Sequence, residues 1–277
     1  MKKLNYLNVG CGNKFHKDWV NVDMVSSSPH VQAVNLLKGI PFPDNHFEVV
    51  YHSQVLEHFP KEKAQAFIQE CFRVLKPNGL LRVVLPDLEN IIDEYKKFLN
   101  QNLENPTPIS EANYDWIMLE MFDQTVRNYG GGQMAVYLRQ AQLVNEQYII
   151  DRIGFVGSTI RHQAQQTTPS LATQLKKALT DFTVFRKALK TAWHKVKYIF
   201  ASQEARIGAF RLGGEVHQWM YDRYSLARLL SSCGFVEMRV KNPFESDVPK
   251  WSEYELDVKN GMVYDPTSLF MEARKKA

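Results

Sequence analysis

The stretch LNVGCGN at residues 7–13 ends a short apolar run in two glycines. Backbone amides can approach a ligand closely at such a turn, because glycine has no side chain to hold the ligand away. A second short apolar run, at residues 19–22, ends at Asp23. A carboxylate that follows the next strand can accept hydrogen bonds from a ribose diol. Gly10, Gly12 and Asp23 are therefore the first candidate ligand-binding residues of the chain.

This turn lacks two features of a dinucleotide-binding fingerprint. The third small residue of that fingerprint would fall at position 15, where the chain has Phe15. The acidic residue of the fingerprint would lie about 20 residues beyond the glycines, whereas Asp23 comes much sooner. A nicotinamide or flavin dinucleotide is therefore disfavoured as the ligand.

The next part of the chain predicts a strand, a helix and a strand. Apolar runs at residues 47–52 and 80–85 predict the strands, and residues 61–75 carry apolar side chains at helical spacing. The Pro-Asn-Gly sequence at 77–79 is expected to end the helix. Two strands joined by a helix are expected to lie parallel with a right-handed crossover.

The C-terminal part repeats this pattern and predicts the edge of the sheet. Ser225 is expected to cap a helix that Gly234 ends. Residues 235–241 and 268–275 predict two strands separated by a long loop. We expect these strands to pair antiparallel at the edge of the sheet.

The middle of the chain differs from both ends, because it shows helical periodicity and almost no strand-like alternation. We therefore expect an α/β fold with a doubly wound, Rossmann-like, mostly parallel sheet, an antiparallel edge strand and a large helical insertion. Residues 1–88 and 214–277 would form the core, and residues 89–213 would form an insertion that caps the acceptor.

Composition excludes several classes of protein. The 277 residues carry a formal charge of +4, and the chain has no nucleic-acid reader motif, so no nucleic-acid partner is expected. The three cysteines form no Cys-x-x-Cys pair, which fits a reducing compartment. Neither an export signal nor a membrane-spanning apolar run is evident, so we expect a cytoplasmic protein. The sequence does not indicate an oligomeric state.

Metal-binding signatures are also missing from the sequence. The core offers four potential ligands, but no HExxH, cysteine-rich or EF-hand spacing connects them. These potential ligands are His52, Glu57, His58 and Asp87. No required metal is therefore expected.

Four motifs in a fixed order make the chain resemble the class I S-adenosylmethionine-dependent methyltransferases. The motifs are LNVGCGN at 7–13, VNVDM at 20–24, IPFPDNHFEVVYHSQVLEH at 40–58 and FRVLKPNGLLRVVLPD at 72–87. The end of the chain, GGEVHQWMYDRYSLARLLSSCGF followed by SLFMEARK, is similar to a type 11-like group often linked to surface-glycan biosynthesis. The resemblance implies a seven-stranded sheet and S-adenosylmethionine as the cofactor, and it leaves residues 89–213 unexplained.

The resemblance also implies the residues that bind the cofactor. The glycine turn would face the methionine part, the acidic residue would bind the ribose, the segment before the PFPD loop would cover the adenine, and the residues after the 47–52 strand would line the sulfonium end. In this order, these residues are Gly10, Cys11 and Gly12; Asp23; Asn35 and Leu36; and Ser53 and Gln54. Family members usually have a full helix between the first two strands, but here the connection is so short that we expect little or no helix.

Three residues are candidate bases, and each has a structural alternative. In order of preference they are His217, His58 and Asp87. His217 lies among aromatic residues that would otherwise anchor the insertion, and His58 would otherwise start a surface helix. Asp87 directly follows a strand and would otherwise cap a loop.

Two features of the insertion support further interpretations. Asp123, Arg127 and the glycines at 130–132 either shape a substrate wall or form a turn between helices. Residues 171–200 predict a basic amphipathic helix, which either contacts an anionic membrane or packs on its own domain with a solvated lysine face.

The sequence as a whole predicts methyl transfer to a small-molecule or glycan acceptor, at oxygen. One alternative is a methyltransferase that acts on a lipid or natural product at a membrane surface, using the basic helix. Another alternative is a protein that binds the cofactor without catalysis and acts as a partner in a biosynthetic complex.

Overall fold

The computed structural model describes residues 5–165 and 201–277. Its main sheet has seven strands in the order β3-β2-β1-β4-β5-β9-β6. The strands are β1 (Tyr6–Val9), β2 (Val20–Asp23), β3 (Val31–Ala33), β4 (Phe47–Ser53), β5 (Leu75–Pro86), β6 (Phe235–Lys241) and β9 (Ser268–Lys275). The first five run parallel, and β9 is antiparallel to both β5 and β6. The predicted Rossmann-like fold class is confirmed.

The antiparallel strand lies one position in from the edge of the sheet. The predicted antiparallel pairing of the last two strands at this edge is confirmed, and within the pair β9 inserts between β5 and β6, so that β6 forms the edge and runs parallel to β5. The return from β6 to β9 explains this order, because two strands joined in this way pair antiparallel. The sequence also missed β3, which has only three residues and two exposed side chains.

Helices α1 (Lys61–Val74) and α9 (Arg223–Ser232) pack on one face of the sheet, where their apolar side chains share a core cluster with the strands. Two predicted boundaries were wrong. The helix does not continue to residues 77–79, because Leu75 already pairs with Phe47 at the start of β5. Ser225 is not the capping residue: Asp222 caps α9, and Ser225 completes the capping box from the third helical position.

The opposite face of the sheet is covered by aromatic side chains from loops. The β1–β2 connection contains no helix, as the sequence predicted. Trp19 from this connection packs edge-on against Tyr6 and Tyr254, with ring centroids 5.0 and 5.1 Å apart. The loop between β6 and β9 adds Trp251 to the same cluster and carries a small hairpin, β7 (Val258–Lys259) and β8 (Met262–Val263). The sequence did not predict this hairpin.

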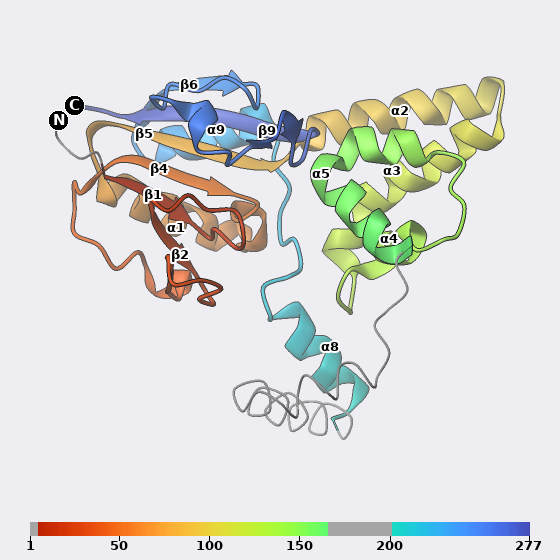
Figure 1. Ribbon diagram of the computed structural model, residues 1–277, viewed down its shortest axis with the longest axis horizontal. Helices are drawn as coiled ribbons and strands as arrows, with labels where there is room; N and C mark the ends of the chain where they lie inside the picture. The colour runs from red at the N-terminus through yellow and green to blue at the C-terminus, as the bar shows by residue number, and fades with distance from the viewer. Residues whose placement is uncertain (1–4, 166–200) are drawn as a thin grey trace.

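A group of helices lies beyond the carboxyl ends of the parallel strands (Figure 1). These helices are α2 (Leu88–Glu104), α3 (Pro108–Val126), α4 (Gly132–Leu138) and α5 (Glu146–Gln165), followed by α8 (Gln203–Arg211). None of the described helices combines the length and apolarity needed to cross a lipid bilayer. The division into a core and an insertion with the boundaries given above stays a prediction.

His52 makes the stability of the core depend on pH. The ring is fully buried on β4 against Phe67, and burial lowers the pKa of His52 from 6.5 to about 3. Between these values the unfolded chain binds the proton and the folded chain does not, so stability falls as the pH drops. We expect the free energy of unfolding of the wild-type protein to fall by up to about 1.4 kcal/mol per pH unit because of His52, and His52→Leu should abolish this contribution. Urea denaturation at pH 7, 6, 5 and 4 measures it, and identical slopes in both proteins would contradict the assignment.

Candidate active site

The glycine turn after β1 is tied to the end of β2 by backbone hydrogen bonds. The amides of Gly10 and Cys11 donate to the Val22 carbonyl at 2.8 and 3.1 Å. The Gly12 amide donates to Oδ2 of Asp23 at 2.8 Å. Both glycines have positive φ angles, 66° and 52°, which side-chain-bearing residues rarely adopt. The turn and the acidic residue therefore form one unit at the carboxyl edge of the sheet.

A cavity of about 520 Å³ opens at this unit and has the features that an adenosine-containing cofactor requires. Gly10, Gly12, Asp23, Leu36 and Gln54 all line it, so five of the predicted cofactor residues meet at one site. A side chain at Gly12 would meet nothing within 4 Å, which shows that the turn opens directly into the cavity. Apolar walls beside a single strand-end carboxylate suit a base and a ribose, so these residues fit S-adenosylmethionine.

Three predicted cofactor residues do not line this cavity. Cys11 is buried in the turn. Asn35 caps the short helix η1 (Leu36–Lys38) by accepting a hydrogen bond from the Leu37 amide at 3.0 Å. The Ser53 hydroxyl accepts a hydrogen bond from the Lys14 ammonium at 3.2 Å. The geometry gives all three a supporting position, and their roles in cofactor binding stay predictions.

The cavity also has lining residues that the sequence analysis missed. They come from α1, from the last residue of α8 and from the segment that follows α8, and include Lys63, Arg211, Gly213, Gly214 and Gln218. The adjacent glycines Gly213 and Gly214 were the available signal, because paired glycines suit close approach to a ligand. One wall of this cavity therefore comes from a segment that lies about 200 residues after the glycine turn in the sequence.

The two glycines are expected to differ in their tolerance of a methyl group. A Cβ at Gly10 would lie 2.5 Å from Cγ2 of Val55, whereas a Cβ at Gly12 meets open space. The left-handed backbone costs both variants about 1 kcal/mol, and overpacking adds about 1–3 kcal/mol for Gly10→Ala. Urea denaturation of the two variants measures the difference. An equal loss of stability would contradict the geometry.

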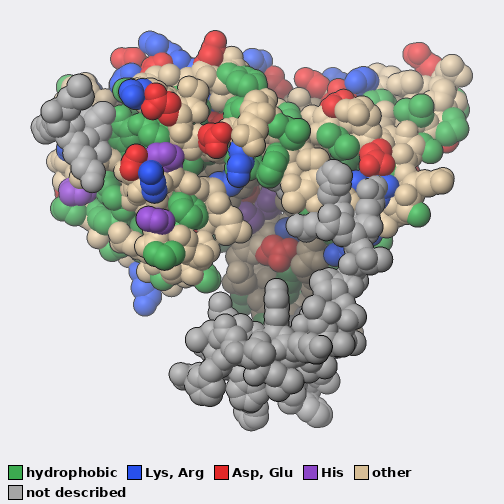
Figure 2. Space-filling model, viewed as in Figure 1, with side chains coloured by type: hydrophobic (Ala, Val, Ile, Leu, Met, Phe, Trp, Pro, Cys, Tyr) green, Lys and Arg blue, Asp and Glu red, His purple; other side chains and the backbone are tan. Residues whose placement is uncertain are grey.

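A second cavity, of about 380 Å³, lies between the carboxyl edge of the sheet and helices α3, α4 and α5. Gln54 and His58 line both cavities, so the two spaces meet at these side chains. All three candidate bases, His58, Asp87 and His217, line the second cavity. Figure 2 shows the recess between the sheet and the helices, with histidine and acidic side chains within it.

An extended segment brings His217 against His58. The amides of Gln218 and Trp219 donate to the Glu57 carbonyl at 2.7 and 3.2 Å, and the His217 amide donates to the Gln124 carbonyl of α3 at 2.9 Å. The two imidazole rings consequently lie edge to face with centroids 4.8 Å apart. Nδ1 of His58 lies 3.3 Å from the Val216 carbonyl.

Burial shifts the pKa values of the titratable groups at this point. It lowers the pKa of His217 to about 3 and also lowers that of His58, so both rings are neutral at pH 7 and can accept a proton. It raises the pKa of Asp87, whose carboxylate also caps α2 by accepting from the Glu89 amide at 3.0 Å. Asp87 thus lines the cavity and caps a helix, and its role as a base stays a prediction.

The predicted substrate wall is only partly formed by the residues we named. Arg127 and Gly131 line the second cavity. Asp123 is buried and serves α4, because its carboxylate accepts from the Gln133 and Met134 amides at 2.7 and 3.3 Å. These residues therefore form the turn between α3 and α4 and also part of the wall of the second cavity.

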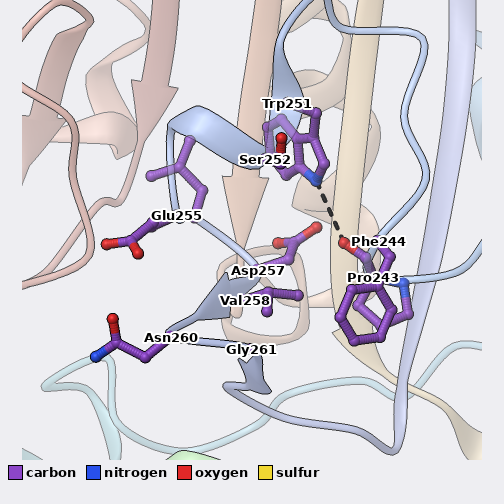
Figure 3. Close-up of a pocket in the computed structure, with 10 residues that line it drawn as sticks. Pro243, Phe244, Trp251, Ser252, Glu255, Asp257, Val258, Asn260 and Gly261 are labelled. Atoms are coloured by element: carbon purple, nitrogen blue, oxygen red, sulfur yellow. Dashed lines mark hydrogen bonds between the residues drawn. The ribbon is translucent and has the colours of Figure 1, made fainter.

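A smaller cavity, of about 260 Å³, lies in the loop between β6 and β9 (Figure 3). It shares no lining residue with the other two cavities. The buried Asp257 at its wall already accepts hydrogen bonds from Arg82 and Tyr51. This cavity is accordingly part of the packing of the loop on the sheet.

Comparisons with known proteins find a family match in the part of the chain that runs from β1 into β5. Residues 7–83 match the family described as "Methyltransferase domain". An uncharacterised protein of Haemophilus influenzae is 34% identical over 107 residues, or 37% of this chain and 41% of that protein. A probable S-adenosylmethionine-dependent methyltransferase of Mycolicibacterium smegmatis is 45% identical over 51 residues, or 18% of this chain and 19% of that protein. The chain thus spans less than half the length of these relatives.

Among solved structures, the comparison finds an S-adenosylmethionine-dependent methyltransferase from Archaeoglobus fulgidus, with a TM-score of 0.37 and 11% identity; the match covers 98% of this chain and 86% of that chain. The family match supports a class I methyltransferase domain, and it implies S-adenosylmethionine as the cofactor. The predicted basic helix at 171–200 lies outside the described residues, and the link to glycan biosynthesis stays a prediction.

Proposed function

We propose that this protein transfers a methyl group from S-adenosylmethionine to an oxygen atom of a small-molecule or glycan acceptor. The observation that carries the proposal is the meeting of two cavities at Gln54 and His58. One cavity has the strand-end glycines and the carboxylate that suit the cofactor, and the other is bounded by the helices and lined by the candidate bases. A donor and an acceptor bound in this way would react where the cavities join.

The residues of the second cavity favour an acceptor that carries hydroxyl groups. Four carboxylates, Asp87, Glu120, Glu215 and Asp265, line it together with Arg127 and two histidines. Carboxylates and imidazoles accept hydrogen bonds from hydroxyls, and the apolar side chains of α4 and α5 would pack against a ring. This arrangement supports a polyol or glycan and disfavours a purely apolar lipid tail.

His58 is the best-placed proton acceptor, ahead of His217, because it alone of the three candidate bases lines both cavities. S-adenosylmethionine, when bound, supplies a methyl group on a sulfonium that leaves as a neutral thioether. The acceptor oxygen gains the bond to the methyl carbon and gives its proton to the neutral His58 ring. The enclosing helices exclude water and hold the acceptor in line.

Isotopic labelling tests this function directly. The purified protein is incubated with a methyl-labelled donor and a cell extract, and the products are analysed by mass spectrometry. We expect label in the O-methyl group of a methyl ether with wild-type protein and none with Asp23→Ala. Label in an amine, or no label despite measured cofactor binding, would overturn the proposal, and the second outcome would favour a non-catalytic binding partner.

A further inference from the structure

One buried carboxylate, that of Glu57, lies beside the candidate bases. The side chain of Glu57 is 1% exposed, and neither of its oxygens accepts a hydrogen bond of normal geometry from the described residues. An unpaired buried carboxylate is costly, so such groups are usually paired, protonated or bound to a metal. Glu57 follows β4 and lines neither cavity itself, but the next residue, His58, lines both.

Two histidines lie near this carboxylate. His58 is the next residue in the chain, and His217 comes from the segment that follows α8. One ligand atom from each of Glu57, His58 and His217 lies within 4.8 Å of the others. Nε2 of His58 is 4.0 Å from Oε1 of Glu57. The described part of the chain supplies no hydrogen-bond partner for the His217 ring. Two imidazoles and one carboxylate that converge on one point are the protein ligands of many catalytic zinc sites.

The surroundings of His58 match those of a metal ligand. Its Nδ1 lies 3.3 Å from the Val216 carbonyl, which can fix the tautomer that leaves Nε2 free to bind a cation. His58 and His217 both line the second cavity, so a metal held here would keep a coordination position open toward the acceptor. Catalytic zinc sites have three protein ligands and such an open position.

We propose that Glu57, His58 and His217 bind one divalent transition-metal ion, Zn²⁺ being the best match, at the junction of the two cavities. The inference deepens the proposed function and shares its site, because the metal would bind the acceptor hydroxyl and lower its pKa before methyl transfer. The bound hydroxyl would release its proton to water as the acceptor enters, before the helices exclude water, and His58 would act as a ligand in place of the base given above. This assignment departs from the sequence, which predicted no required metal.

Metal binding can be tested without any acceptor or methyl donor, so its failure and the failure of methyl transfer are distinguishable. The tag-free full-length protein is stripped with a chelator and titrated with Zn²⁺ in a calorimeter, and Co²⁺ is titrated in parallel and followed by visible absorption. We expect one ion per chain and cobalt d–d bands typical of four or five ligands.

Variants locate the ion. Glu57→Gln and His217→Gln are expected to weaken Zn²⁺ binding at least about 100-fold, since the loss of a ligand should exceed the 10–100-fold effect of outer-shell changes. His16→Gln is the matched control. Like the proposed ligands, His16 has a carboxylate nearby, with its Nδ1 3.9 Å from Oδ2 of Asp18, but it lines neither cavity. Glu57→Gln is close in shape to the original residue, and its melting temperature checks that it folds. The proposal would be overturned if the wild-type protein bound no Zn²⁺. It would also be overturned if both variants bound Zn²⁺ as tightly as the wild-type protein does.

Discussion

Replacing Asp23 by Ala is expected to weaken S-adenosylmethionine binding by about 100-fold or more. Its carboxylate lines the cofactor cavity at the end of β2, where it can accept two hydrogen bonds from a ribose diol. Hydrogen bonds to a charged group contribute about 1.5–3 kcal/mol each, so losing two costs at least this factor. Isothermal titration calorimetry with the cofactor measures the change.

Two further variants separate cofactor binding from local structure. The Asp23 carboxylate also accepts from the amides of Gly12 at 2.8 Å and Val25 at 3.2 Å. Asp23→Asn keeps one carbonyl oxygen, which can accept from the Gly12 amide but not also from the Val25 amide, so it should preserve the bond within the glycine turn and still bind the cofactor poorly. Asp18→Ala removes an exposed carboxylate outside the cavity and should bind normally. Normal binding by Asp23→Ala would contradict the ribose role.

Arg82→Met is expected to lower the free energy of unfolding by about 3–5 kcal/mol, the range for removing one partner of a buried ion pair. The guanidinium is fully buried on β5. It donates to Oδ2 of Asp257 at 2.7 and 2.9 Å and to Oε1 of Glu272 at 2.8 Å. Methionine would leave Asp257 buried without its cation and would leave Glu272 with only the Lys241 ammonium, 4.0 Å from Oε2. Urea denaturation measures the loss.

The network around Arg82 also fixes the aromatic loop to the sheet. Asp257 accepts from the Tyr51 hydroxyl at 2.6 Å, and the Arg82 guanidinium lies 4.7 Å from the centre of the Trp251 ring (Figure 3 shows Asp257 and Trp251). Arg239→Ala on β6 is the control, since its ion pair with Glu237 is exposed and contributes at most about 1 kcal/mol. A loss of less than 1 kcal/mol for Arg82→Met would contradict the importance of this network.

The parts of the site that follow a strand could be predicted from the sequence. Apolar runs that end in glycine or an acidic residue locate Gly10, Gly12, Asp23 and Asp87, because parallel strands end at one edge of the sheet. Gln54 and His58, which follow β4, were instead implied by the family resemblance. Each of these six residues lines at least one of the two cavities, and Gln54 and His58 line both.

The proximity of His217 to Glu57 could not be predicted in the same way. It depends on backbone amides of residues 217–219 that donate to carbonyls of Glu57 and Gln124. Any residue except proline can form such bonds, so they leave no signature in the sequence. The aromatic loop that replaces a helix on one face was missed for a related reason, because its residues follow neither a helical nor a strand period.

Titration of the wild-type protein with S-adenosylhomocysteine, the demethylated cofactor, is the most direct test of the central claim that the cavity at Gly12 and Asp23 binds S-adenosylmethionine. Calorimetry needs no knowledge of the acceptor and reports binding alone. The structure predicts one site per chain, lost in Asp23→Ala and retained in Asp18→Ala. Folded wild-type protein that shows no binding, or binding that persists in Asp23→Ala, would contradict it.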